Sequence, residues 1–83
     1  MWLAKVYVTL KPLVNDPQGI TIKGSLHNLG FESVQDVRAG KYFEVRLEAA
    51  SREEAEKAVA EMCSRLLANP VIEDYRYEVA ALP

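Results

Sequence analysis

Two side chains in this sequence have the intrinsic chemistry for catalysis or metal binding near neutral pH, the single histidine His27 and the single cysteine Cys63. A catalytic histidine needs an oriented nucleophile or carboxylate beside it, and its neighbours Leu26 and Asn28 supply neither. Cys63 lies twelve residues beyond a predicted helix start at Ser51, whereas reactive thiolates favour helix N-termini or cationic neighbours. One cysteine and one histidine do not make a zinc site without several carboxylates. We therefore predict that His27 is a surface residue and that Cys63 fills the core.

Phosphate chemistry is equally poorly supported, because the four glycines match neither GxxxxGK[ST] nor GxGxxG.

The stretch that stands out is Asp16-Pro17-Gln18-Gly19. Asp is a favoured N-cap and Pro suits the first helical position, so this stretch predicts a helix start. Gly19 weakens that helix by about 0.5–1 kcal/mol relative to Ala. A glycine in this place permits close approach of another backbone or a ligand, and the free N–H groups of a helix start suit an anion. A structural role is favoured over a contact role, and both stay open.

The size and composition of the chain limit what it does. Its 83 residues allow a single small domain, residues 1–83, with a thin core. A net charge of −2 argues against nucleic acid as a partner. A single cysteine excludes an internal disulfide and fits a reducing compartment. The longest apolar runs are four residues, far short of the roughly 20 of a membrane span. We expect a soluble, cytoplasmic protein, too small to be a complete multi-substrate enzyme.

Alternation of apolar and polar residues predicts the strands. Residues 2–11 alternate regularly until Pro12, as do residues 41–48 and residues 71–79. Residues 32–38 alternate poorly, because Val34 and Val37 are three positions apart, and a bulge is expected there. Ala39-Gly40 is interpreted as a tight turn that joins this strand to the next in a hairpin.

Helical periodicity predicts two helices. The first begins at Asp16-Pro17, ends at Gly30 in a left-handed cap, and carries a buried stripe of Ile22, Leu26 and Leu29. The second begins with a capping box formed by Ser51 and Glu54, and it ends before Asn69-Pro70. Its apolar stripe consists of Ala55, Val59, Met62 and Leu66.

The resulting order is β-α-β-β-α-β, so the predicted fold is an α+β, ferredoxin-like fold. We expect a four-stranded antiparallel sheet with two helices on one face. The other face has no helix to cover it, and it should be solvated or form an oligomer interface. Its side chains are predicted to be those of Lys5, Tyr7, Thr9, Tyr42, Glu44, Arg46 and Arg76.

Four segments together resemble the PurS family, the small subunits of phosphoribosylformylglycinamidine (FGAM) synthase. They are residues 7–19, Leu29-Gly30-Phe31, the stretch from Val37 to Tyr42, and the stretch from Leu67 to Tyr75. Each segment is weak alone, but four in this order and spacing are specific. The resemblance covers nearly the whole chain, from about Lys5 to Val79.

The resemblance implies a role in de novo purine biosynthesis. The synthase converts formylglycinamide ribonucleotide (FGAR), glutamine and ATP to FGAM, glutamate, ADP and phosphate. A glutaminase subunit (PurQ) releases ammonia, and a synthetase subunit (PurL) binds ATP and carries out the ligation. The small subunit has no catalytic residue of its own, dimerises, bridges the other two and assists ammonia transfer. ATP and Mg²⁺ are used by the complex, and this chain is expected to bind no cofactor or metal.

We expect the contacts with the larger subunits to involve the first helix start and the predicted turn after residue 37. The candidate interface residues are Asp16, Pro17, Gln18, Gly19, Arg38, Gly40 and Lys41. An alternative of another class is an ACT-type regulatory domain, which shares the β-α-β-β-α-β order and would bind a small molecule in the loop after its first strand. An acylphosphatase-like hydrolase has the same fold, but no arginine lies in a glycine-lined loop after the first strand here.

Overall fold

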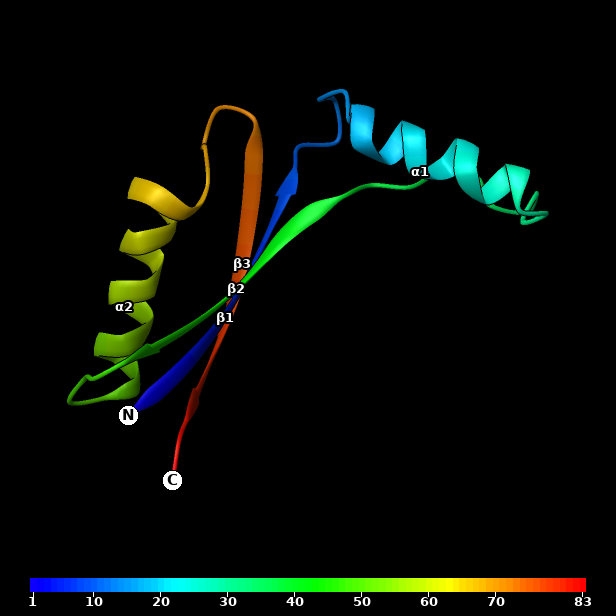
Figure 1. Ribbon diagram of the computed structural model, residues 1–83. Coiled ribbons are helices and arrows are strands. Elements are labelled where there is room, and N and C mark those ends of the chain that lie inside the picture. The colour runs from blue at the N-terminus through cyan, green and yellow to red at the C-terminus, as the bar shows by residue number, and fades with distance from the viewer.

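Three antiparallel strands form the sheet in the computed structural model, which describes all of residues 1–83 (Figure 1). They are β1 (Trp2–Leu10), β2 (Gly40–Leu47) and β3 (Glu73–Ala81), in the order β2-β1-β3. Each matches a predicted strand to within two residues. The first strand is therefore the central one, and Val6 lies opposite Phe43 on one side and Tyr77 on the other.

The second helix covers one face of this sheet. It consists of α2 (Arg52–Met62) and a continuing π-helical turn, η1 (Cys63–Leu67). The predicted Ser51 cap is confirmed, because the Ser51 hydroxyl accepts a bond from the Glu54 N–H. The Glu54 carboxylate accepts a bond from the Ala50 N–H, one residue before the N-cap residue of a regular capping box. The core lies between this helix and β1 and β3. It consists of Ala4, Val6, Val8, Ala55, Val59, Cys63, Ala68 and Val79.

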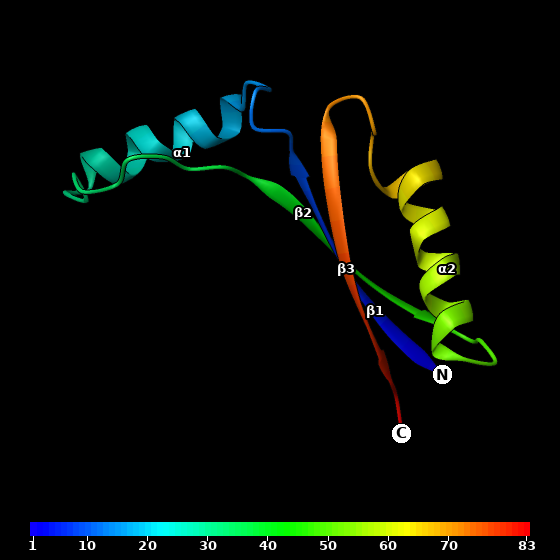
Figure 2. The same cartoon turned by 180° about the vertical axis from the view of Figure 1, so that it is seen from behind.

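The first helix, α1 (Pro17–Asn28), lies beyond the end of the sheet, on the side away from α2 (Figures 1 and 2). Gly30 has a φ of 98° and forms the predicted left-handed cap. The N–H groups of Gly30 and Phe31 donate to the carbonyl oxygens of His27 and Leu26, which is a Schellman motif. The helix itself was predicted correctly, but its position on the sheet was not.

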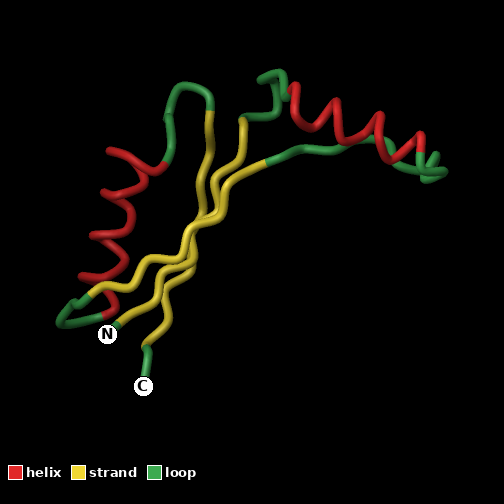
Figure 3. Tube along the Cα trace, in the orientation of Figure 1, coloured by secondary structure: helices red, strands yellow, loops and turns green.

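The prediction of a four-stranded sheet with both helices on one face is wrong for this chain. Residues 32–38 form no strand: Glu32 and Ser33 lie in a turn, and the residues after them run back along α1 and continue directly into β2 (Figure 3). The predicted hairpin turn at Ala39-Gly40 is absent, because the only positive φ in the chain is at Gly30 and the favoured two-residue hairpin turns need at least one such angle. The predicted stripe of α1 is accordingly not buried: Leu29 is 73% exposed and Ile22 38%, and Leu26 is half-buried.

The chain is extended as a result. Its radius of gyration is 16.3 Å, against about 12 Å for a compact chain of this length. Its accessible surface is 6076 Å², whereas a compact protein of this mass exposes about 5,000 Å². None of the helices has the length and apolar character needed to cross a membrane.

The face of the sheet opposite α2 has the predicted composition, since the strand register places Lys5 between Glu44 and Glu78 and Tyr7 between Tyr42 and Arg76. The rings of Tyr7 and Tyr42 are 5.2 Å apart, and the Arg76 guanidinium lies 4.1 Å from the Tyr7 ring centre. Aromatic and guanidinium groups of this kind are frequent at protein interfaces.

Candidate functional site at the base of the first helix

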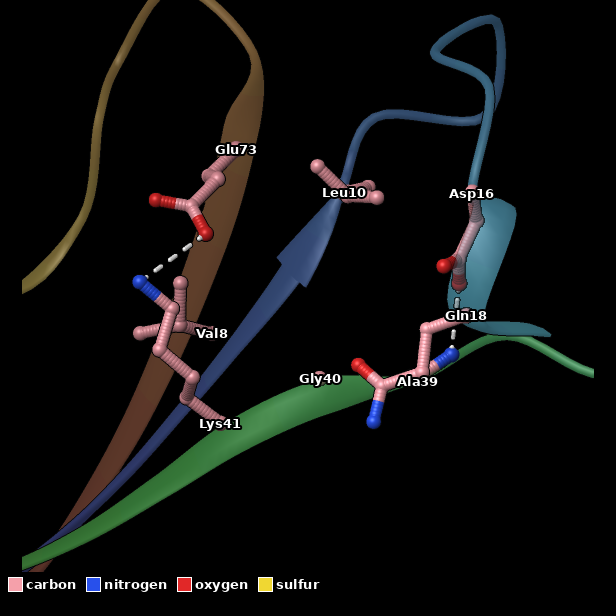
Figure 4. A pocket seen from close by; sticks show the side chains of 8 residues that line it. All are labelled: Val8, Leu10, Asp16, Gln18, Ala39, Gly40, Lys41 and Glu73. Atoms are coloured by element: carbon pink, nitrogen blue, oxygen red, sulfur yellow. Dashed lines mark hydrogen bonds and ion pairs between the residues drawn. The ribbon is translucent and has the colours of Figure 1, made fainter.

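The two stretches that the sequence singled out, residues 16–19 and 38–41, lie side by side at the base of α1 (Figure 4). We call residues 16–19 and 37–41 together the α1 junction. Asp16 is its centre and is only 4% exposed. Its Oδ1 accepts a bond from the Gly19 N–H at 3.0 Å, which is the predicted N-cap, and its Oδ2 accepts one from the Ala39 N–H at 2.7 Å. One carboxylate thus begins the helix and ties it to the segment that enters β2.

The pKa of Asp16 is lowered by these bonds. The Gly19 N–H contributes most and the Ala39 N–H next, because both favour the ionised form. Burial opposes the shift, and the positive charge of Arg38 adds to it. The junction is therefore built around an ionised carboxylate.

Gly19 is in backbone contact with the same segment and is the only buried residue of α1. A Cβ at this position would overlap the carbonyl oxygen of Val37. The sequence suggested that a backbone or a ligand comes close to Gly19, and the structure shows that it is the chain's own backbone at Val37.

Arg38 fixes the loop between β1 and α1. One nitrogen of its guanidinium donates to the carbonyl oxygens of Lys11, at 3.0 Å, and Val14, at 2.8 Å. A rigid guanidinium satisfies two carbonyl groups at once, which holds that loop in a single path. The segment before β2 is therefore attached to the chain on both sides of the helix start.

The other end of the junction lies against the sheet. A Cβ on Gly40 would be 2.6 Å from the Val8 carbonyl oxygen, so the β2 backbone passes close to β1 here. Lys41 Nζ is 3.4 Å from a carboxylate oxygen of Glu73. The Asn69 N–H, followed by Lys41, lowers the pKa of Glu73.

A hollow of about 170 Å³ opens between the junction and the end of the sheet. It is smaller than the roughly 300–1,000 Å³ of a typical small-molecule site. Asp16, Lys41 and Glu73 use their charges within the chain. The hollow is lined by Val8, Leu10, Asp16, Gln18, Ala39, Gly40, Lys41 and Glu73 (Figure 4).

The seven candidate interface residues thus have different surroundings. Asp16 and Gly19 are buried by the chain itself, and Arg38 is bonded to it. Pro17, Gln18, Gly40 and Lys41 are exposed at the surface of the junction. The arrangement sets the direction in which α1 leaves the sheet.

His27 and Cys63, the two side chains considered for catalysis or metal binding, lie outside the α1 junction. Cys63 is fully buried in the core, as predicted, and burial raises the pKa of its thiol. His27 is half-buried rather than a surface residue, since its Nε2–H donates to the Val34 carbonyl oxygen at 2.7 Å. It fastens the far end of α1 to the extended segment. No group of three His, Cys, Asp or Glu side chains has the geometry to hold a metal ion.

Sequence reasoning did not find that Val34 and Val37 take part through their carbonyl oxygens. Every residue has a backbone carbonyl, so the residue type at positions 34 and 37 does not predict such a contact. Only the residues that approach these carbonyl groups could indicate it. Gly19 in a first helical turn was such a signal, and it pointed to the close approach of a backbone or a ligand without deciding between them.

Comparison with known proteins gives a consistent result over the whole chain. The sequence pattern of the family described as PurS, phosphoribosylformylglycinamidine (FGAM) synthase, matches residues 3–81. The FGAM synthase subunit PurS of Bacillus subtilis is 53% identical over 95% of this chain and 93% of that protein. The PurS subunit of Archaeoglobus fulgidus is 51% identical over 88% of this chain and 91% of that protein.

Solved structures extend the similarity to the fold. The crystal structure of Bacillus subtilis PurS superposes with a TM-score of 0.87 at 52% identity, and it covers 98% of this chain and all of that one. A chain in the structure of PurLQS from Thermotoga maritima has a TM-score of 0.86 at 31% identity, over 96% of this chain and 99% of that one. The extended arrangement of sheet and α1 is therefore shared with experimentally determined structures.

Proposed function

The chain belongs to the PurS family of FGAM synthase subunits, and we propose that in that complex it is the non-catalytic subunit that bridges the glutaminase and the synthetase. FGAM synthase is a glutamine-dependent ligase of purine biosynthesis, and this chain is one of its subunits. The observation that carries the bridging role is the α1 junction. Its charged groups hold α1 away from the sheet. One small chain thus presents two separate surfaces, one at α1 and one at the sheet.

Bridging has a chemical purpose in this reaction. Ammonia released from glutamine at one subunit must reach an activated substrate at another, and ammonia that escapes into water is protonated to ammonium, which is not nucleophilic. A subunit that seals the contact between the two sites keeps water away from the reaction path. Such a subunit needs surfaces rather than catalytic side chains, and we propose that it assists ammonia transfer in this way.

The exposed part of the α1 junction is the surface we assign to the larger subunits. Pro17, Gln18, Gly40 and Lys41 form it, and Asp16, Gly19 and Arg38 hold it in place from within. The Thermotoga maritima structure named above is of PurLQS, which supports PurL and PurQ as the partners of this chain.

We also propose that the chain associates with a second copy of itself. The uncovered apolar stripe of α1 and the aromatic and charged open face of the sheet both support self-association. ATP and Mg²⁺ are assigned to the other subunits, with no cofactor or metal bound by this chain. We place the complex in the cytoplasm, in keeping with a chain whose one cysteine is unpaired.

Reconstitution tests this function. PurL and PurQ would be assayed for FGAM formation with glutamine, and separately with excess ammonium salt, in the presence and absence of this chain. We expect this chain to raise the glutamine-dependent rate at least about tenfold and to change the ammonia-dependent rate much less. A full glutamine-dependent rate without this chain would refute the proposal.

A surface variant locates the contact. Gln18→Arg places a long charged side chain on the exposed side of the junction, whereas Ser64→Arg makes a similar change on the exposed surface of η1. We expect Gln18→Arg to reduce the glutamine-dependent rate and Ser64→Arg to leave it within about twofold. Equal effects of the two variants would remove the junction from the interface.

A further inference from the structure

The loop between β1 and α1 holds one leucine entirely in solvent. Leu13 is 100% exposed, so its side chain is not packed against any other part of the chain. Burial of apolar surface is the main favourable contribution to folding and to association, and this leucine adds none of it to the fold. Single exposed apolar residues are ordinary on protein surfaces. The case for a function therefore depends on how Leu13 is held and on what surrounds it.

The backbone on both sides of Leu13 is fixed. The Val14 N–H donates to the Lys11 carbonyl oxygen at 2.9 Å, which closes a four-residue turn. Pro12 is at the second position of this turn, where the fixed φ of proline is favoured. The Arg38 guanidinium donates to the carbonyl oxygens of the first and last turn residues, at 3.0 and 2.8 Å. Leu13 is therefore an apolar side chain at the corner of a rigid turn.

A second loop brings more exposed apolar groups to the same end of the sheet. β1 ends and β3 begins at this end (Figure 1), and the Lys11 N–H donates to the Ile72 carbonyl oxygen at 2.8 Å. Val71 is 78% exposed and Ile72 39%. We call Pro12, Leu13, Val71 and Ile72 the sheet-end patch. The bond from Lys11 holds its two loops together.

The charged side chains around the sheet-end patch are paired within the chain. Lys11 Nζ lies 2.9 Å from a carboxylate oxygen of Asp74, and Lys41 Nζ lies 3.4 Å from one of Glu73. Arg38 is bonded to the two carbonyl groups of the turn. A phosphate group or a nucleic acid would have to compete with these partners for the positive charges. The patch fits instead an apolar pocket on another protein.

We propose that Leu13 is the anchor residue by which this chain binds PurL, with its side chain inserted into an apolar pocket of that subunit. The inference rests on the bridging function proposed above, and it names the residue that carries one of the contacts. The sheet-end patch continues into the exposed part of the α1 junction, because only three residues separate Leu13 from Pro17. A partner seated on Pro17 and Gln18 can therefore cover Leu13 as well.

The chemistry of the reaction favours PurL over PurQ as the occupant. Contacts that rely on buried apolar side chains are typical of lasting associations. The contact with the glutaminase is the one that gains from being reversible, because glutamine that is hydrolysed while no acceptor is bound is lost. The lasting partner is then the subunit that receives the ammonia, and the apolar anchor is assigned to it.

The rigidity of the turn has a role in such a contact. A loop that becomes ordered only on binding loses conformational entropy, and this loss lowers the affinity. The bonds from Arg38 and the ring of Pro12 remove that freedom before PurL binds. Arg38 is thus a positioning residue, which acts on PurL through Leu13.

Substitution at Leu13 tests the anchor directly. Because the side chain is fully exposed, Leu13→Asp should leave thermal denaturation unchanged. With PurL immobilised for biolayer interferometry, we expect Leu13→Asp to weaken binding at least about tenfold. Leu13→Met keeps an apolar side chain and should stay within about threefold. Leu66→Asp is the matched control, because Leu66 is 83% exposed on η1, and it should bind as the unmodified chain does.

A double-mutant cycle tests the positioning role of Arg38. Arg38→Met keeps a long side chain but removes both bonds to the turn, so binding to PurL should weaken about three- to tenfold. In the Leu13→Asp background the same substitution should have little further effect, because no anchor is left to position. Additive losses would overturn the positioning role, since Arg38 would then act through a contact of its own or through the fold.

The outcomes separate this inference from the function on which it rests. Binding of Leu13→Asp to PurL within about twofold of the unmodified chain would overturn the anchor. Weakened binding to PurQ alone, measured in the same way, would overturn the choice of PurL. An unmodified chain that binds neither subunit, separately or together, would overturn the bridging function itself. Reconstituted glutamine-dependent synthesis tests bridging independently of Leu13.

Discussion

Gly19 and Val37 are in direct backbone contact, with the Val37 carbonyl oxygen in the place that a side chain on residue 19 would occupy. Eighteen positions separate them in the sequence, and their contact decides how close α1 lies to the segment that enters β2. A glycine is required here by space rather than by φ, since only Gly30 has a positive φ.

Gly19→Ala should therefore destabilise the protein even though alanine is the better helix former. Helix propensity alone would favour the variant by about 0.5–1 kcal/mol, but overlap with a backbone oxygen should reverse this to a loss of about 1–3 kcal/mol. Gly24→Ala is the matched control, because a Cβ at residue 24 meets nothing within 4 Å, and it should gain about 0.5–1 kcal/mol. Urea denaturation at one fixed protein concentration measures both. Changes of the same sign would contradict the assigned contact.

Asp16 should make the stability of the protein dependent on pH in the acid range. Its folded pKa lies below the reference value of 3.8 because two N–H groups favour the carboxylate. The stabilisation is thus fully present above about pH 4 and is lost as the pH falls through the lowered folded pKa. In Asp16→Asn the amide oxygen accepts only one of the two bonds and does not titrate.

The measurement is urea denaturation between about pH 6 and pH 3 for the unmodified chain and for Asp16→Asn. Glu73, whose pKa is also lowered, is present in both and contributes equally. We expect the free energy of unfolding to fall less steeply with acid in the variant. Parallel curves would show that Asp16 is not the titrating group.

Tyr42 should lose its phenolic proton at a higher pH than an ordinary tyrosine. The hydrogen bond to Glu44, 2.8 Å long, raises its pKa from 10.0 to about 12, because the bond is lost when the phenol gives up its proton. The stabilisation from this bond is fully present below pH 10 and is lost as the pH rises through about 12. Tyrosinate absorbance titrated up to that pH should show one late transition. Glu44→Gln should shift it down and Tyr42→Phe should abolish it; a late transition that survives Tyr42→Phe would assign it to another residue.

Val59→Ala should cost about 2 kcal/mol in unfolding free energy, because Val59 is fully buried under the sheet and its truncation leaves a cavity. Val71, in the loop before β3, is 78% exposed, and Val71→Ala should change stability by less than about 0.5 kcal/mol. Thermal denaturation of the two variants side by side measures the difference. A similar loss in both would mean that the loop is packed in the protein in solution.

The strands and helices were largely predictable because their signals are local. Alternation in residues 2–11 and the helix cap at Ser51 both depend on residues that are close in the sequence, and the strand and the cap are both found as predicted. Gly30 likewise carries its signal at one position. Their positions relative to one another were harder to predict.

The missing fourth strand shows what local sequence patterns do not predict. Residues 32–38 were predicted to form a strand, but Glu32 and Ser33 lie in a turn and residues 34–38 pair with no strand. Whether such a segment joins a sheet depends on contacts made far along the chain. The Ala39 N–H, taken by Asp16, and the Arg38 side chain, bonded to the Lys11 and Val14 carbonyls, keep this segment beside α1. The sequence drew attention to Asp16 and Arg38 separately, as surface residues, and gave no sign that they act together.

The placement of β1 at the centre of the sheet also governs how the protein is made. Trp2 pairs with Ala81, and the Leu82 N–H donates to the Met1 carbonyl oxygen. β1 leaves the ribosome before residues 73–81, so its second edge stays uncovered until they follow, and contacts of such long sequence separation form slowly. Until then its Val6 and Val8 are open to other chains, so newly made protein should rely on chaperones more than its small size suggests.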